Sequence, residues 1–227
     1  EEISRRTSLT AMAHLTCVGK SVRELEDVLD EFADAGIDHV LALRGDPPGD
    51  VRATWTAHPE GLTYASELVE LIARRGGFEI GVAAFPDVHP ESADLDADVE
   101  TLVRKAEAGA SFAVTQMVFD PETYLALRDR VNARVDLPIT AGIMPITNLK
   151  QIRRMSELMG TPIPAATVER LHAVEGDPAA VRAEGIAIAI EMCQRLLDEG
   201  VPGLHFITMN RSTATLEVHG ALGLGDR

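Results

Sequence analysis

Short apolar runs alternate along the chain with longer segments of helical periodicity. This alternation is typical of parallel strands joined by helices, because a strand buried on both faces is apolar throughout while a covering helix is apolar along one stripe. The pattern predicts an α/β fold with strands at 10–17, 38–43, 79–85, 112–117, 138–143 and 204–208.

The helix after the first strand is the most clearly marked. Ser21 and Glu24 have the spacing of a capping box, and Gly36 follows the last helical residues. Residues 1–7 are predicted to end an earlier helix that leads into the first strand. The capped helix is expected to bury an apolar stripe formed by Val22, Leu25, Leu29 and Phe32.

A similar helix-to-strand junction occurs three times, around Gly36, Gly109 and Gly200. Glycine suits the left-handed backbone that ends a helix, so the recurrence indicates repeated αβ turns. A closed barrel of such units has eight strands, and six are predicted here. We therefore expect a (β/α)8 TIM barrel, as a single domain over 1–227, whose first two βα units are missing from this chain.

The composition indicates which classes of partner the protein is not expected to bind. The formal net charge of −15 disfavours nucleic acid, which requires clustered Lys and Arg. Cys17 and Cys193 are too few for a disulfide framework and lack the spacing of a zinc site, so we expect no metal. No apolar run reaches the roughly 18 residues of a membrane span. The sequence therefore predicts a soluble, cytoplasmic protein.

Reactive groups of a β/α barrel collect where the strands end, and polar residues stand there in this chain. Asp46 follows the second predicted strand. It either forms a turn before Pro47 or faces a cavity, where a carboxylate can stabilise a developing cation. Arg44 either pairs with a surface acid or contacts a ligand. Gln116 either caps its strand or donates and accepts at a polar ring.

The helix predicted at 94–108 carries both acids and bases. A solvated charged face is the ordinary interpretation of such a helix. Arg104 and Lys105 are also an adjacent pair of cations, and such a pair suits a diphosphate. No P-loop motif is present, and the glycines after Gly220 follow a helix rather than a strand, so the sequence has no dinucleotide fingerprint.

Six segments together carry a resemblance to a known family. In order and approximate spacing they are similar to the motifs of methylenetetrahydrofolate reductases, and the match covers essentially the whole chain. The segments are His14-Leu15-Thr16-Cys17, Leu43-Arg44-Gly45-Asp46, Ala83-Ala84-Phe85-Pro86-Asp87-Val88-His89-Pro90-Glu91, Thr115-Gln116, Gly142-Ile143-Met144-Pro145 and Asn210-Arg211.

The resemblance implies an FAD site. Asp46 would contact the flavin and tune its reactivity, and Arg104 and Lys105 would bind the pyrophosphate. Thr101 stands where an amide is expected, and a hydroxyl can still donate a hydrogen bond. The full set of implied cofactor residues is His14, Arg44, Gly45, Asp46, Tyr64, Ala65, Ala83, Phe85, His89, Asp98, Thr101, Arg104 and Lys105.

The resemblance also implies the substrate and the reaction. NAD(P)H would give a hydride to FAD, and the reduced flavin would pass it to methylenetetrahydrofolate, with Asp46 as the catalytic residue. Gln116 would bind the pterin, and Arg211 would bind the glutamate carboxylate. Leu149 replaces an aromatic residue that stacks on the ligand in some relatives. Exposed strand edges would favour a homo-oligomer, and the choice between NADH and NADPH stays open.

Two family residues have no counterpart in this sequence. The Glu that donates a proton, within a Phe-Glu-Phe-type motif, and a Thr after the second barrel strand are both missing. Two rival interpretations therefore stay open. One is a flavin-free reductase that transfers hydride directly from the nicotinamide, and the other is a non-catalytic barrel that binds folate or flavin.

Overall fold

The computed structural model describes residues 2–47, 49 and 53–224. Six strands form a sheet in the order β1-β2-β3-β4-β5-β6, and the pairs β1–β2, β2–β3 and β5–β6 are parallel. The ends of each strand lie within two residues of their predicted positions; the largest differences are that β1 begins two residues late and β6 ends two residues early. The α/β prediction is confirmed. The eight-stranded barrel with its first two βα units missing from this chain, and the single-domain assignment, stay predictions.

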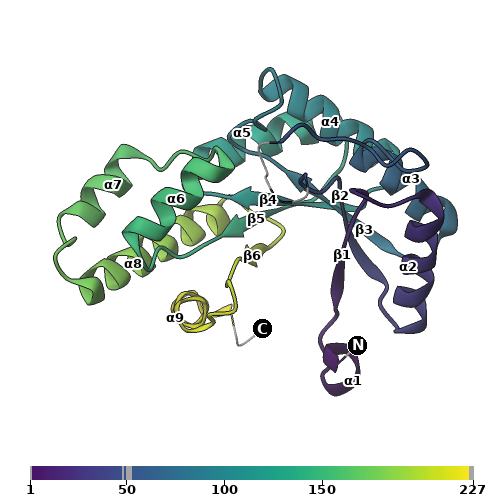
Figure 1. Ribbon diagram of the computed structural model, residues 1–227. Helices are drawn as coiled ribbons and strands as arrows, with labels where there is room; N and C mark the ends of the chain where they lie inside the picture. The colour runs from purple at the N-terminus through teal and green to yellow at the C-terminus, as the bar shows by residue number, and fades with distance from the viewer. Residues whose placement is uncertain (1, 48, 50–52, 225–227) are drawn as a thin grey trace. The chain divides into compact units, whose positions relative to one another are not determined.

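The chain divides into two compact units, and each is described by itself. Unit 1 comprises Glu1–Ala83, Glu100–Ala113 and Arg134–Pro138. Its elements are α1 (Glu2–Arg6), β1 (Met12–Thr16), α2 (Val22–Asp34), β2 (His39–Leu43), α3 (Ala65–Arg75), nearly all of β3 (Glu79–Ala84) and the second part of α4 (Leu95–Glu107). In Figure 1, α2 and α3 flank the purple and blue strands β1 and β2.

The capping box of α2 is confirmed. Glu24 N–H donates to Ser21 Oγ, and the Glu24 carboxylate accepts from Ser21 N–H at 2.8 Å. Leu25 and Leu29 are fully buried as predicted, whereas Val22 and Phe32 are only half-buried. These two residues stand near the ends of the helix.

The glycine junctions have the predicted backbone. Gly36, Gly109 and Gly200 have φ of 73°, 118° and 74°, values that residues with a Cβ rarely adopt. Each of these glycines lets a helix end and the chain turn into the next strand.

Unit 2 comprises Ala84–Val99, Val114–Ala133 and Ile139–Arg227. Its elements include most of β4 (Phe112–Met117), α5 (Pro121–Asn132), β5 (Ile139–Ile143), α6 (Leu149–Met159), α7 (Ala165–His172), α8 (Pro178–Asp198), β6 (Leu204–Phe206) and α9 (Thr213–Ala221). α6, α7 and α8 lie together in Figure 1. No helix among the described residues is long and apolar enough to cross a membrane.

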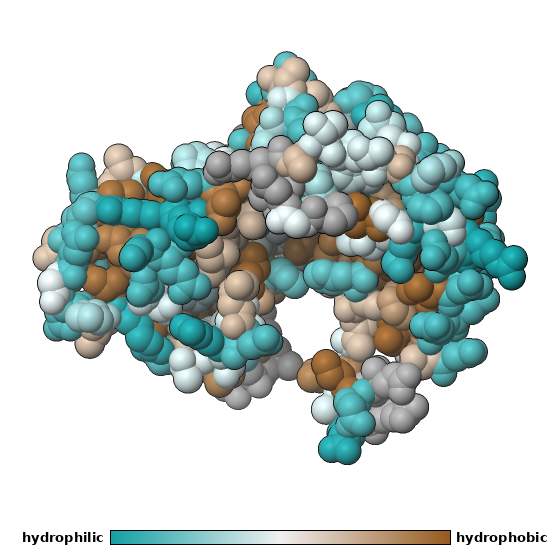
Figure 2. Space-filling model, viewed as in Figure 1, coloured by the Kyte–Doolittle hydropathy of each residue, from teal (hydrophilic) through white to brown (hydrophobic). Residues whose placement is uncertain are grey.

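The core of unit 2 joins β4 to three of its helices. The buried residues in this cluster are Met117, Phe119, Ile146, Leu149, Ile152, Leu171 and Val181. Over α6, α7 and α8, Figure 2 shows brown apolar side chains interspersed with teal polar ones. The exposed Leu158 and Met159 at the end of α6 belong to this mixed surface.

Candidate functional site

A pocket of about 310 Å³ lies in unit 2, where β5 and β6 end. Its walls come from the loop after β5, the start of α6, the side of α8, the loop after β6 and the first turn of α9. The lining residues are Met144, Pro145, Ile146, Thr147, Asn148, Gln151, Ile152, Arg182, Ile207, Thr208, Met209, Arg211, Thr213, Ala214 and Thr215. In α/β folds, the carboxyl ends of parallel strands are the usual place for a ligand.

The charge of the pocket contrasts with that of the whole chain. Arg182 and Arg211 line it, and no Asp or Glu is among the lining residues. Six hydroxyl or amide side chains add uncharged hydrogen-bonding groups: Thr147, Asn148, Gln151, Thr208, Thr213 and Thr215. In a chain of net charge −15, this lining favours an anionic ligand with several polar atoms.

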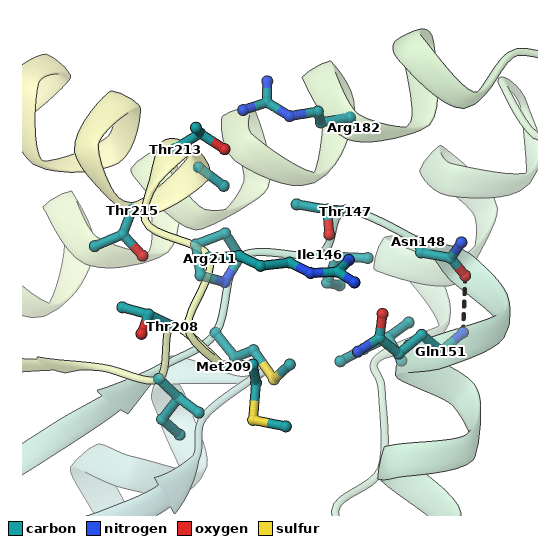
Figure 3. A pocket seen from close by; sticks show the side chains of 15 residues that line it. Ile146, Thr147, Asn148, Gln151, Arg182, Thr208, Met209, Arg211, Thr213 and Thr215 are labelled. Atoms are coloured by element: carbon teal, nitrogen blue, oxygen red, sulfur yellow. Dashed lines mark hydrogen bonds between the residues drawn. The ribbon is translucent and has the colours of Figure 1, made fainter.

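Arg211 is presented by a tight turn after β6. Met209 and Asn210, at the centre of the turn, have φ of 49° and 58°, and Arg211 N–H donates to Thr208 O at 2.8 Å. Two successive residues with positive φ are the mark of a type I′ turn, and this backbone is strained for Met209. In Figure 3 the Arg211 side chain extends across the pocket towards the loop that carries Asn148.

The loop after β5 is held by a helix cap. Asn148 is the N-cap of α6, and its side chain accepts a hydrogen bond from Gln151 N–H at 2.9 Å, the dashed line in Figure 3. Leu149, the next residue, is 7% exposed and packs in the core of unit 2. The structure thus gives Leu149 a packing role, and its contact with a ligand stays a prediction.

Gln116 lies near the end of β4, with its backbone fixed by Thr115. The buried Thr115 hydroxyl donates to Gln116 O at 2.7 Å and accepts from Gly142 N–H at 2.8 Å. The Gln116 side chain accepts from Met117 N–H at 3.0 Å, and its Nε2 lies 3.6 Å from Met159 Sδ. The contact with sulfur is weak, so a ligand that accepts a hydrogen bond can replace it.

In unit 1, Arg44, Gly45 and Asp46 follow the carboxyl end of β2, whereas His14 lies in the middle of β1. Asp46 is exposed, as is His14 on β1. The Arg44 guanidinium carbon is 5.3 Å from the Trp55 ring centroid, and Trp55 Nε1 donates to Gly45 O at 3.1 Å. The hydrogen bond from Trp55 therefore fixes the backbone just before Asp46, and the motif did not predict this contact.

Tyr64 and Ala65 lie at the start of α3. The Glu67 carboxylate accepts hydrogen bonds from Thr63 N–H and Tyr64 N–H, at 2.6 and 3.0 Å. These bonds fix the first turn and leave the Tyr64 side chain turned to solvent, with 62% of its surface exposed. An aromatic ring this exposed is available to contact a planar ligand.

Arg104 and Lys105 do not share a surface. Lys105 is 8% exposed, and its Nζ donates to Ala83 O at 3.0 Å. Arg104 is exposed, and its guanidinium donates to Thr101 Oγ1 at 3.0 Å. Adjacent helical residues point about 100° apart, which explains the difference. Arg104 is the one of the two that is placed to meet a ligand from solvent.

In unit 2, Asp98 and His89 belong to a hydrogen-bond network in the loop after β3. The buried Asp98 carboxylate accepts from His89 N–H at 2.7 Å and from Ser92 Oγ at 2.5 Å. The His89 ring meets the Phe85 ring edge-on, with centroids 4.5 Å apart. The structure therefore brings three predicted cofactor residues together and shows that Asp98 orders the loop after β3.

Asp87, in the same loop, has an unusual environment. Burial raises the pKa of this carboxyl to about 6, and the nearby charge of Asp120 acts in the same direction, while a hydrogen bond with Thr123 opposes them. The next residue, Val88, has a φ of 67°, a strained value for a β-branched side chain.

This environment predicts a pH dependence of stability. Asp87 binds its proton more tightly in the folded protein than in the unfolded chain. The stability it contributes is therefore full below about pH 4 and is lost as the pH rises through about 6. After a discount for partial exposure, the loss should be about 1–2 kcal/mol. Urea denaturation of the wild type and of Asp87→Asn at pH 4.5 and pH 7 measures this loss. Between the two pH values, the free energy of unfolding should fall by this amount more in the wild type than in the variant. Parallel responses would contradict the prediction.

Comparisons with known proteins show which family the chain belongs to. Residues 1–223 match the family model described as methylenetetrahydrofolate reductase. The 5,10-methylenetetrahydrofolate reductase of Escherichia coli is 39% identical over 224 residues, which are 98% of this chain and 73% of that protein. Methylenetetrahydrofolate reductase 2 of Saccharomyces cerevisiae is 38% identical over 216 residues, which are 92% of this chain and 36% of the yeast protein.

A solved structure shares the fold at low identity. It is an uncharacterised protein from Clostridium thermocellum that binds two copies of 5-methyl-5,6,7,8-tetrahydrofolic acid. Its TM-score is 0.54 with 14% identity, and the match covers 98% of this chain and 97% of that one. This likeness concerns the fold, whereas the family follows from the sequence matches: the chain belongs to the methylenetetrahydrofolate reductase family.

Proposed function

We propose that this protein reduces 5,10-methylenetetrahydrofolate to 5-methyltetrahydrofolate with NAD(P)H through FAD, in cytoplasmic one-carbon metabolism that supplies methionine. Membership of the family supports the reaction class. The observation on this chain that carries the proposal is the arginine-lined pocket at the ends of β5 and β6. A folate ends in glutamate carboxylates, which suit a pocket that has cations and no acids in its lining.

The residues of unit 1 fit an FAD cofactor by their chemistry. The exposed Arg104 supplies a cation and donors for a diphosphate, the exposed Tyr64 supplies an aromatic face, and Asp46 supplies an acceptor. We propose that these residues hold the cofactor, together with Arg44 and His14. FAD, when bound, accepts a hydride from NAD(P)H and delivers it to the folate.

The roles of the chain's own residues follow from charge and hydrogen bonding. The Asp46 carboxylate supplies a fixed negative charge that stabilises the cationic iminium form of the substrate. The Gln116 amide orients the pterin, because it can donate and accept at adjacent ring atoms. Arg211 binds the glutamate carboxylate through a guanidinium that the turn after β6 holds in place.

Cofactor retention tests the FAD site and separates this proposal from a flavin-free reductase. The purified full-length protein should show flavin absorbance, and the cofactor released by denaturation should be FAD. A colourless protein that still reduces methylenetetrahydrofolate would favour direct hydride transfer. A protein that binds folate with no reductase activity, with or without flavin, would favour a non-catalytic role.

The different placements of Arg104 and Lys105 predict different effects of their replacement. Arg104→Ala should weaken FAD retention about tenfold and leave the melting temperature of the flavin-free protein unchanged, because one exposed charge-assisted contact is lost. Lys105→Ala should lower the melting temperature, because it removes a buried stem and its bond to Ala83 O. Arg74→Ala, at an exposed position on α3, is the matched control. Equal flavin content in the Arg104 and Arg74 variants would show that Arg104 belongs to a solvated face.

A further inference from the structure

Trp55 contacts the turn after β2 at two points. Its Nε1 donates to Gly45 O at 3.1 Å, and the Arg44 guanidinium carbon lies 5.3 Å from the centroid of its ring. Both contacts are made with the two residues that come directly before Asp46. Trp55 itself stands in the loop between β2 and α3, outside every segment that carried the family resemblance.

The other carbonyls of this turn are held by the residues that follow β1. Leu43 O and Arg44 O accept hydrogen bonds from Cys17 N–H and Val18 N–H, at 3.2 and 3.1 Å. The carbonyl of Gly45 is the third in this series, and its donor is the indole N–H rather than the backbone. The series ends at the peptide bond that leads to the predicted catalytic carboxylate.

Gly45 cannot fix this peptide bond by itself. Its φ is 84°, and a Cβ there would stand 2.7 Å from Val18 Cγ1 and 2.9 Å from Thr16 Cβ. The backbone conformation and the close packing against the end of β1 therefore both require glycine. Since glycine has the greatest conformational freedom of any residue, the peptide plane after it needs a restraint from elsewhere. The indole N–H supplies that restraint.

The loop that carries Trp55 is anchored to unit 1 on its C-terminal side. Val22 N–H donates to Glu60 O at 2.9 Å, and Ser21 and Gly61 form an antiparallel bridge. The loop is thus fastened to the start of α2, independently of the turn after β2. Trp55 is half-buried between these attachments, so its ring has a defined position against the turn.

Resting on the proposed function, we propose that Trp55 is a positioning residue for hydride transfer to the folate. Its N–H fixes the peptide bond before Asp46, and its ring holds the Arg44 guanidinium by a cation–π contact. The Asp46 carboxylate then keeps one position relative to the flavin and the substrate, as electrostatic stabilisation of a transition state requires. Trp55 acts through Asp46, so its effect is limited by that of the Asp46 charge.

Trp55→Phe tests the hydrogen bond, because phenylalanine keeps an aromatic face for Arg44 and has no N–H. In the FAD-loaded full-length protein, reoxidation of the reduced flavin by methylenetetrahydrofolate should slow roughly tenfold, while flavin reduction by NAD(P)H should stay within about twofold of wild type. Trp55→Leu lacks both contacts and should lose roughly thirtyfold in the folate half-reaction. Trp55→Tyr also lacks the indole N–H and serves if Trp55→Phe folds poorly.

Phe78→Leu is the matched control. The Phe78 ring forms the same kind of contact with an arginine, 5.2 Å from the Arg75 guanidinium carbon, but it stands at the amino end of β3, away from the turn after β2. This variant should change neither half-reaction.

A double-mutant cycle separates positioning from general damage to the fold. In the Asp46→Asn background, Trp55→Phe should slow the folate half-reaction no further, because no charge is left to position. The flavin potential, measured by equilibration with a reference dye, gives a readout that does not depend on turnover. It should rise in Trp55→Phe towards the value in Asp46→Asn and should rise no further in the double variant.

Three results would overturn the proposal. These are Trp55 variants that behave like Phe78→Leu, an equal loss in both half-reactions, and losses that add in full in the double variant. A wild-type protein that holds no flavin, or whose reduced flavin is not reoxidised by methylenetetrahydrofolate, would instead contradict the proposed function before any variant is compared.

Discussion

Asp46→Asn is expected to slow hydride transfer to methylenetetrahydrofolate by roughly a hundredfold or more. The substitution keeps the size and most of the hydrogen bonding of this exposed side chain and removes only its charge. If the charge stabilises the cationic substrate in the transition state by about 2.7 to 4 kcal/mol, a loss of this size follows. Reduction of the flavin by NAD(P)H should change far less, and the flavin potential should rise, because a negative charge opposes the reduced, anionic flavin.

Stopped-flow measurement of each half-reaction on the full-length protein decides this. Asp34→Asn, at the opposite end of α2 from the strand ends, is a matched control for the loss of one exposed carboxylate in unit 1. An equal loss in both half-reactions would make Asp46 a positioning residue. No loss in either would leave it a turn-forming residue before Pro47.

Gly185→Ala should destabilise the protein strongly, although alanine is the better helix former. Gly185 lies in the middle of α8, and a Cβ there would stand 1.7 Å from the backbone oxygen of Ile146, which lines the pocket. The loop after β5 would have to move away from the helix. Such overpacking costs about 3 kcal/mol, offset by about 1 kcal/mol of helix propensity. The melting temperature should fall by roughly 4–8 °C.

Gly220→Ala is the matched control, because Gly220 is also helical and a Cβ there would meet no atom within 4 Å. This variant should melt at the same temperature as the wild type or slightly higher. If both variants were to melt alike, the close contact between α8 and the loop after β5 would not be a constraint on the pocket.

The positions of the strands could be predicted from the sequence because local signals specify them. A strand buried on both faces must be apolar, and a helix end needs a residue that tolerates positive φ, so β1 to β6 and the turns at Gly36, Gly109 and Gly200 were marked in the chain. The capping box at Ser21 and Glu24 is equally local. Half-burial of Val22 and Phe32 depends on packing between elements, which a periodicity does not contain.

The candidate site was predictable only in part. Arg211 was found through its motif, whereas Arg182 stands in a long helix with no local signal of a ligand, and only the packing of α8 beside the loops brings it to the pocket. The strained turn at Met209 and Asn210 has no glycine to mark it. The adjacent charges of Arg104 and Lys105 indicated one joint site, but helical geometry sends one to solvent and buries the other.

The most direct test of the proposed function is the product formed by the full-length protein from NAD(P)H and methylenetetrahydrofolate without air. Separation and mass measurement of the folates should show 5-methyltetrahydrofolate in a one-to-one ratio with the NAD(P)H consumed, and flavin that NAD(P)H has reduced should be reoxidised when methylenetetrahydrofolate is added. Tight binding of the folate with no methyl product, under conditions where the flavin is bound and reduced, would contradict the account.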